Sequence, residues 1–199
     1  MAKKNIRNTR GRIVGAAWRL FYEQGYEDTT VEEIIELSHT SRGSFYHYFD
    51  GKDALLSTLS DLFDEKYESL QPQLTESMTA MEQLLYLNRE LFSMIEDSVS
   101  RDLLARLLST QLVTSGERHL LNHDRTYYRL LRRIISAGQA AKELTNQESA
   151  EELVKVYALC ERALMYDWCL CGGDYSLSQY AEKVLPYFLT GFLPDESLK

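Results

Sequence analysis

The chain has 199 residues, a formal net charge of −8 and hydrophobic residues at 44% of its positions. This composition is typical of a folded protein and excludes an intrinsically disordered chain. No stretch reaches the roughly 20 uncharged apolar residues of a transmembrane helix, and no apolar run follows the basic first residues as a secretory signal requires. Cys160, Cys169 and Cys171 lie inside an apolar helical pattern, which favours reduced thiols and a cytoplasmic protein.

Charge is unevenly distributed along the chain. Residues 1–56 carry eight basic and eight acidic side chains, so the remaining residues carry the whole net charge of −8. Six basic side chains and no acidic one lie within the first 19 residues. This asymmetry predicts a basic N-terminal arm joined to an acidic body with a different task.

Apolar residues recur at helical spacing along the chain, and only three prolines interrupt the pattern. No segment alternates apolar and polar residues in the way of a half-buried strand. An apolar stripe predicts a first helix over residues 10–24, and Gly25 can end it because glycine accepts the left-handed backbone of a C-terminal cap. The chain is therefore predicted to be all-α.

Two short helices joined by a three-residue turn are predicted next. Thr30 and Glu33 form a capping-box pattern before the first of them, and Ser41 can cap the second, which begins at Arg42. The second helix turns small and polar residues outward. This is the helix-turn-helix plan, in which the second helix enters the major groove of DNA.

The outward residues of this second helix suit contacts with DNA. Small residues at 41, 43 and 44 allow a close approach, and Arg42 can donate to guanine or to phosphate. The hydroxyl of Tyr46 and the ammonium of Lys52 suit phosphate oxygens. The alternative is a plain three-helix bundle with an amphipathic third helix, which leaves these residues and the basic arm unexplained.

Over roughly residues 8–60 the chain resembles the DNA-binding domain of the tetracycline-repressor (TetR) family of bacterial transcription regulators. The residues in the family's spacing are Ala17, Phe21, Gly25, Tyr26, Thr29, Thr30, Ile34, Ser41, Gly43, Tyr46, Phe49, Lys52 and Leu55. The resemblance implies phosphate contacts by Thr30, Tyr46 and Lys52, and groove contacts by Arg42, Ser44 and His47. With the small residues of the same helix, the predicted DNA contacts are Thr30, Ser41, Arg42, Gly43, Ser44, Tyr46, His47 and Lys52.

Two residues of the predicted turn depart from the family pattern. The family usually has glycine where this chain has His39, and histidine is among the few other residues that tolerate the left-handed conformation. It usually has valine where this chain has Thr40, whose hydroxyl needs a local hydrogen-bond partner when buried. Neither departure removes a predicted DNA contact.

The acidic body is predicted to contain further helices. They cover residues 53–71, 81–95, 103–112, 126–144 and 151–171, followed by a last helix that Ser176 caps and Pro186 kinks. Residues 151–171 are apolar on more than one side, which indicates burial on more than one side. The resemblance implies that the last two helices pair with their copies in a second subunit. The predicted dimer interface comprises Leu153, Tyr157, Cys160, Leu164, Tyr180, Val184 and Phe188.

Large apolar side chains of the body are candidates for lining an effector pocket, and plain core packing is the alternative for each. The candidates are Tyr86, Phe92, Met94, Tyr127, Tyr157, Met165 and Trp168. No cofactor is expected. His119 and His123 lie four residues apart without a further ligand at a recognised spacing, so no metal site is predicted. Glycine-rich phosphate loops and hydrolase motifs are absent from the sequence, which argues against an enzyme.

These observations predict two domains, a helix-turn-helix DNA-binding domain at residues 1–51 and a ligand-binding and dimerisation domain at residues 52–199. The predicted function is that of a homodimeric transcriptional repressor. It would leave a palindromic operator on double-stranded DNA when a small apolar or aromatic effector binds the body. The alternative is a protein–protein adaptor that keeps the helix-turn-helix shape without binding DNA.

Overall fold

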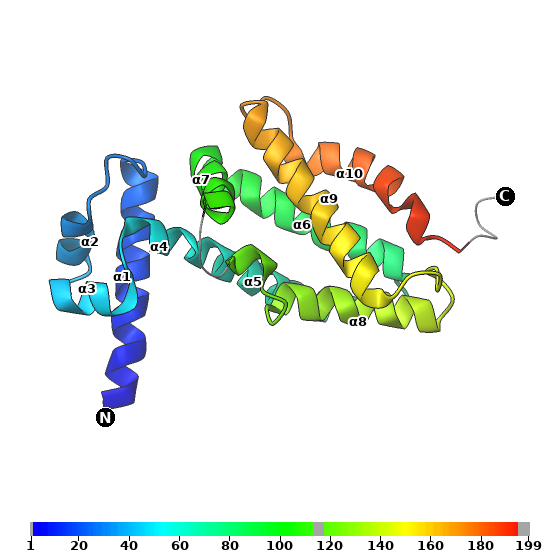
Figure 1. The fold of residues 1–199 in the computed structure, drawn as a ribbon, viewed down its shortest axis with the longest axis horizontal. Coiled ribbons are helices and arrows are strands. Elements are labelled where there is room, and N and C mark those ends of the chain that lie inside the picture. The colour runs from blue at the N-terminus through cyan, green and yellow to red at the C-terminus, as the bar shows by residue number, and fades with distance from the viewer. Residues whose placement is uncertain (1, 114–117, 195–199) are drawn as a thin grey trace.

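The computed structural model describes residues 2–113 and 118–194, with side chains from residue 9 onwards, and these residues form helices and no strand (Figure 1). The all-α prediction is thus confirmed for the described residues. The side chains of Lys3, Lys4 and Arg7 in the predicted basic arm lie outside them. Within the described ranges, no helix is long and apolar enough to span a membrane.

Three helices form the N-terminal unit, which lies at one end of the molecule (Figure 1). They are α1 (Ala2–Glu23), α2 (Val31–Leu37) and α3 (Arg42–Tyr48). Ile13, Ile34 and Phe45, one from each helix, are fully buried in the centre of this unit. Gly25 follows α1 with a φ of 91°, as its predicted role in ending the helix requires.

The predicted helix over residues 53–71 is wrong in one respect, because two helices occupy this segment. They are α4 (Lys52–Leu56) and α5 (Thr58–Leu70), which meet at Ser57. The Ser57 hydroxyl donates to the Ala54 carbonyl at 2.7 Å, and the Ser60 hydroxyl donates to the Ser57 carbonyl at 2.6 Å. Hydroxyls that bond nearby carbonyls compete with the helical ladder, which explains the break. The apolar stripe of the sequence continues across the break at Ser57, so the sequence pattern does not predict the break.

The body is a bundle of the remaining helices, in which α5 packs against α6 and α8 (Figure 1). They are α6 (Ala80–Ser98), α7 (Arg101–Val113), α8 (Thr126–Ala140), α9 (Ala150–Leu170) and α10 (Leu177–Phe188), with short 3₁₀ turns at Gln71–Gln73, His119–Leu121 and Leu189–Phe192. α6 packs against both α10 and α8. Pro186 lies inside α10, in its last turn, and the helix ends at Phe188.

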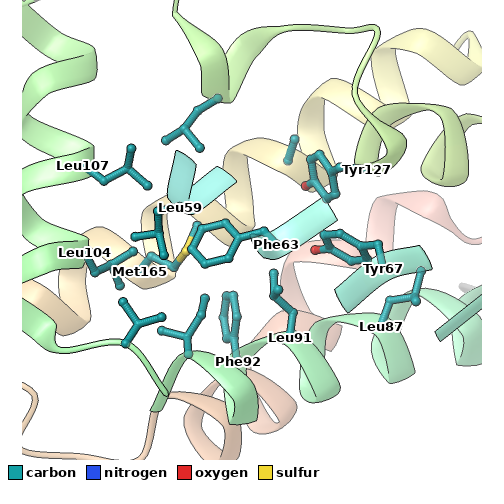
Figure 2. Close-up of a cluster of buried hydrophobic side chains, with 14 of the residues drawn as sticks. Leu59, Phe63, Tyr67, Leu87, Leu91, Phe92, Leu104, Leu107, Tyr127 and Met165 are labelled. Carbon is teal, nitrogen blue, oxygen red and sulfur yellow. The ribbon is translucent and has the colours of Figure 1, made fainter. Parts of the chain in front are cut away.

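The core of the body is apolar and continuous. Side chains from α5, α6, α7, α8 and α9 meet in it, and Figure 2 shows Phe63, Leu91, Leu104 and Met165 among them. Gly138 marks the closest approach of two helices, because a Cβ atom at this position would lie 2.5 Å from the Cβ of Ala80. The helices α6 and α8 can therefore approach this closely only with glycine at position 138.

Candidate DNA interface and effector cavity

The turn between α2 and α3 is stabilised by its own polar residues. His39 has a φ of 51°, which places it in the left-handed region as expected for the glycine-like position. The hydroxyls of Ser38 and Thr40 are 2.8 Å apart and hydrogen-bond to each other, so Thr40 has the local partner that it requires. Both departures from the family pattern are thus accommodated locally.

Side-chain caps fix the start of both helices beside this turn. The Thr30 hydroxyl accepts from the backbone N–H of Glu33 at 3.2 Å, and the Glu33 carboxylate accepts from the backbone N–H of Thr30 at 2.8 Å. This is the predicted capping box, and it lowers the pKa of Glu33. The Ser41 hydroxyl accepts from the backbone N–H of Ser44 at 3.1 Å, as predicted for the cap of α3. The caps hold α3 in a defined orientation on α1 and α2.

The outer face of α3 is polar and accessible. The Arg42 guanidinium is exposed, lies 5.6 Å from the centre of the Tyr46 ring, and forms a 3.2 Å ion pair with Glu32. Tyr46 is 44% exposed, and His47 and Gly43 are exposed beside it. An ion pair between exposed side chains contributes little to stability, so the guanidinium of Arg42 can exchange its partner at small cost.

Lys52 is more constrained than the sequence suggested. Its ammonium donates to the backbone carbonyls of Tyr26 at 2.7 Å and Glu27 at 3.2 Å, and it lies 4.3 Å from the centre of the Tyr26 ring. An ammonium has three donors, so one N–H is left for a phosphate. Lys52 therefore joins α4 to the loop after α1, in addition to its predicted role.

A residue of the body also contacts this loop, and sequence reasoning missed it. Arg106 of α7 forms a 2.6 Å ion pair with Glu27, and its guanidinium lies 4.9 Å from the centre of the Tyr26 ring. On the opposite side of the loop, the Tyr26 hydroxyl donates to the Asp53 carboxylate. The junction between the N-terminal unit and the body is therefore built on Tyr26, with cations from α4 and α7 on its ring.

A small cavity opens in the body between α5, α8 and α9. It is lined by Phe63, Tyr67, Leu91, Leu120, Arg125, Tyr127, Glu161, Arg162 and Met165, and its interior volume is about 30 Å³. This volume accommodates roughly two water molecules. In Figure 2 the hydroxyl ends of Tyr67 and Tyr127 point to the same side of the cluster. The cavity thus has an apolar wall and one polar end.

Glu161 forms the polar end and is buried at 2% exposure. Its carboxylate accepts from the Asn88 side-chain amide at 2.8 Å and from the Tyr127 hydroxyl at 2.5 Å. Burial raises the pKa of Glu161 above its ordinary value, and these hydrogen bonds oppose the rise. An acidic residue inside the apolar run of α9 was the sequence signal that could have pointed to this residue.

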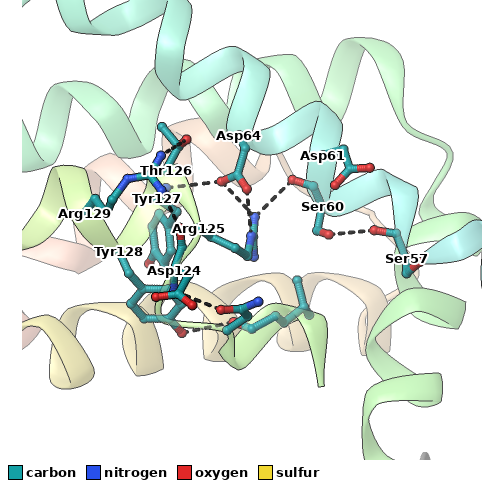
Figure 3. Close-up of polar contacts among 12 residues, drawn as sticks. Ser57, Ser60, Asp61, Asp64, Asp124, Arg125, Thr126, Tyr127, Tyr128 and Arg129 are labelled. Carbon is teal, nitrogen blue, oxygen red and sulfur yellow. Dashed lines mark hydrogen bonds and ion pairs between the residues drawn. The ribbon is translucent and has the colours of Figure 1, made fainter. Parts of the chain in front are cut away.

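The side of the cavity next to α8 is fixed by an ion pair (Figure 3). The Arg125 guanidinium donates to the Asp64 carboxylate at 2.9 and 3.2 Å, and also to the Ser60 carbonyl at 3.1 Å. Asp64 also accepts from the backbone N–H of Tyr127 at 3.2 Å. Asp64 of α5 therefore supplies a hydrogen bond that the N-terminus of α8 needs.

Of the predicted pocket residues, Tyr127 and Met165 line this cavity. Trp168 is buried elsewhere, with its indole N–H donating to the Tyr175 carbonyl at 2.9 Å. The Tyr157 hydroxyl donates to the Leu84 carbonyl at 2.8 Å. The other three residues do not line the cavity either: Phe92 belongs to the core, Met94 packs against it, and Tyr86 lines a separate open hollow.

The predicted dimer residues of α9 need a correction. Leu153, Tyr157, Cys160 and Leu164 are buried within the protomer, at 7% exposure or less, and face its own core. In α10, Tyr180 and Phe188 are exposed and Val184 is half-buried. α9 is apolar nearly all round, so the sequence alone could not show which side faces the core. The outward apolar residues of α9 are Leu159, Tyr166 and Leu170.

Comparison with known proteins places the N-terminal unit in a family. Residues 13–59 match the family described as bacterial regulatory proteins, tetR family, and this stretch contains α2, the turn, α3 and α4. The HTH-type transcriptional regulator TtgR of Pseudomonas putida is 37% identical over 68 residues, which cover 34% of this chain and 32% of that protein. This N-terminal unit belongs to the tetR family.

Solved structures extend the likeness to the body of the chain, whereas the curated relatives match it over only about a third of their length. FadR of Thermus thermophilus, a TetR-family transcriptional repressor in complex with lauroyl-CoA, has a TM-score of 0.72 at 26% identity, covering 92% of this chain and 95% of that one. A TetR-family regulator of Pectobacterium atrosepticum has a TM-score of 0.73 at 18% identity, covering 96% of both chains. The chain therefore has the tetR-family fold, with an N-terminal helix-turn-helix and a C-terminal helical domain.

Proposed function

We propose that this protein is a ligand-responsive transcriptional repressor that binds double-stranded DNA through the outer face of α3. The observation that supports this most is the exposed face of Arg42, Tyr46 and His47 on a helix whose start is capped and whose inner side is buried. Residues 1–51 form the proposed DNA-binding domain, and residues 52–199 the ligand-binding and dimerisation domain. The proposed contacts are those predicted from the sequence, with Lys52 contributing its remaining N–H. The protein is not an enzyme in this proposal and acts in the cytoplasm.

The proposed dimer uses the exposed apolar faces of α9 and α10. Leu159, Tyr166 and Leu170 on α9 and Tyr187 and Phe188 on α10 are each at least 50% exposed. Clusters of large exposed apolar residues mark interaction surfaces. A two-fold axis through this surface presents two copies of α3 to DNA, as a palindromic operator requires.

Effector release is proposed to proceed through α5. The cavity is too small for a drug-sized or fatty ligand, so binding must separate Phe63 and Tyr67 of α5 from the facing helices α8 and α9. α5 continues from α4, whose Lys52 is bonded to the loop after α1. We expect the effector to bind the opened body more tightly than the closed one. The ratio of these two effector affinities sets the largest factor by which the effector can lower the affinity for DNA. The structural neighbour FadR of Thermus thermophilus is in complex with lauroyl-CoA, whose acyl chain is apolar, which supports a ligand-responsive role.

The proposal is tested by selecting binding sites from random duplex DNA with the purified protein. We expect an enriched palindrome. Arg42→Ala should weaken binding to it by about 1–3 kcal/mol, either with relaxed specificity at one base pair or with a smaller salt slope. Arg89→Ala, which removes an exposed arginine of the body, is the control and should bind like the wild type. A folded dimer that enriches no sequence, together with an unchanged Arg42→Ala variant, would favour the protein–protein adaptor.

A further inference from the structure

The hydroxyl of Tyr67 is an unusual feature of the cavity. The side chain is 2% exposed and lines the cavity, yet its hydroxyl makes no hydrogen bond to any described residue. Burial, followed by the charge of the neighbouring Glu161 carboxylate, raises the pKa of Tyr67 well above its ordinary value. Buried hydroxyls are nearly always hydrogen-bonded, so this one is available for a ligand.

Glu161 beside it also has unused hydrogen-bonding capacity. A carboxylate has about four acceptor sites, and Asn88 and Tyr127 occupy two of them. Among the described residues, no cation lies within ion-pair distance of Glu161. A buried carboxylate without a cation is costly, and a cation that enters the cavity would supply the missing countercharge.

The two arginines that line the cavity do not form a comparable site for an anion. Arg125 already makes two hydrogen bonds to Asp64 and one to the Ser60 carbonyl. Arg162 is half-buried and donates to the Tyr128 hydroxyl at 3.3 Å. An anion placed at the buried end would meet the charge of Glu161, so the polar end selects against it.

We propose that the effector is an amphiphilic primary amine, whose protonated amino group donates to Glu161 and to the Tyr67 oxygen at the buried end of the cavity. Its apolar body lies against Phe63, Leu91 and Met165. A primary ammonium has three donors, which match the free acceptor sites of these two residues. This inference rests on the proposed effector role of the body and specifies the chemical class of the effector.

The test compares three ligands with one apolar body and different head groups. Octylamine, 1-octanol and octanoate are titrated into the full-length protein by calorimetry at pH 7.4, below their micellar concentrations. Octylammonium should bind at least about tenfold more tightly than 1-octanol, since a charged hydrogen bond exceeds a neutral one by roughly this factor. Octanoate should bind more weakly than either. Lauroyl-CoA is titrated as well, because a structural neighbour holds it.

Two variants and a control locate the binding of the amine. Glu161→Gln should reduce the preference for octylammonium over 1-octanol to about one, and Tyr67→Phe should reduce it by about threefold. Glu65→Gln removes an exposed carboxylate from α5, the helix that carries Tyr67, and should leave the preference unchanged. Circular dichroism and thermal unfolding establish that each variant is folded, and Tyr67→Phe still tests the site should Glu161→Gln not fold.

Several results would overturn this assignment. They are equal binding of octylammonium and 1-octanol, tighter binding of octanoate, and binding of none of the three. An amine preference that survives in folded Glu161→Gln would place the amine elsewhere, and lauroyl-CoA binding that outcompetes octylammonium would favour an acyl thioester as effector. The titrations contain no DNA, so their failure leaves the proposed DNA binding intact. A failed operator selection likewise leaves the amine site intact.

Discussion

At the scale of single residues, the chemistry of this protein depends on groups whose surroundings differ from those in water. Glu161 is buried with two hydrogen-bond donors and no paired cation, and Tyr67 keeps an unbonded hydroxyl beside it. On the outside, Arg42 keeps a weak ion pair that DNA can replace. In the proposed function, the buried polar groups thus bind a small ligand and the exposed ones bind DNA.

The raised pKa of Glu161 predicts a specific pH dependence of stability. Burial favours the neutral form of Glu161 in the folded state. The stability that this neutral carboxyl contributes is therefore fully present below the ordinary pKa of 4.5, and it is lost as the pH rises through the pKa of the folded protein. From pH 4.5 upward, the free energy of unfolding of the wild type should therefore fall relative to Glu161→Gln. The difference should change by at most about 1.4 kcal/mol per pH unit. Urea unfolding of both proteins between pH 4.5 and 8 measures it, and parallel curves would contradict the assignment.

At the scale of elements, close contacts decide how the helices are arranged. The hydroxyls of Ser57 and Ser60 separate α4 from α5, and Arg106 joins α7 to the loop after α1. Gly138 lets α8 approach α6 at Ala80. Each of these contacts depends on one small or polar residue within its helix.

Substitution of Gly138 tests the closest of these approaches. Gly138→Ala places a methyl group 2.5 Å from the Cβ of Ala80, so it should destabilise the fold by about 1–3 kcal/mol. Gly15→Ala in α1 is the matched control, because nothing lies within 4 Å of its Cβ position. It should stabilise the protein by about 0.5–1 kcal/mol through helix propensity. Chemical denaturation measures both, and a neutral Gly138→Ala variant would show that the two helices move apart at little cost.

At the scale of the whole molecule, the N-terminal unit and the outward faces of α9 and α10 lie far apart (Figure 1). The proposed DNA interface and the proposed dimer interface are therefore separate surfaces of one chain. The cavity lies in the body between them, next to α5. In the proposed mechanism, a signal from the effector reaches the N-terminal unit through α5, α4 and the junction at Tyr26.

The proposed dimer surface predicts the effect of a charge on α10. Phe188→Asp should weaken self-association by about 100-fold, or about 3 kcal/mol, because it replaces an aromatic contact by a charge that loses its water. Tyr22→Asp on α1, where the tyrosine is 83% exposed, is the control and should associate like the wild type. Sedimentation equilibrium measures both constants. An unchanged Phe188→Asp dimer would place the interface on another surface.

The sequence by itself determined the N-terminal unit, because its signals are local. The capping box at Thr30, the cap at Ser41, Gly25 and the turn with His39 act within four residues along the chain, and their geometry follows from that spacing. Tertiary structure alone decided which side of α9 faces the core and which residues line the cavity. Those outcomes depend on partners distant in the sequence, such as Asn88 and Tyr127 on Glu161, or Glu27 on Arg106. A helix that is apolar nearly all round carries no local mark of the side that packs inward, and only its neighbours in space supply one.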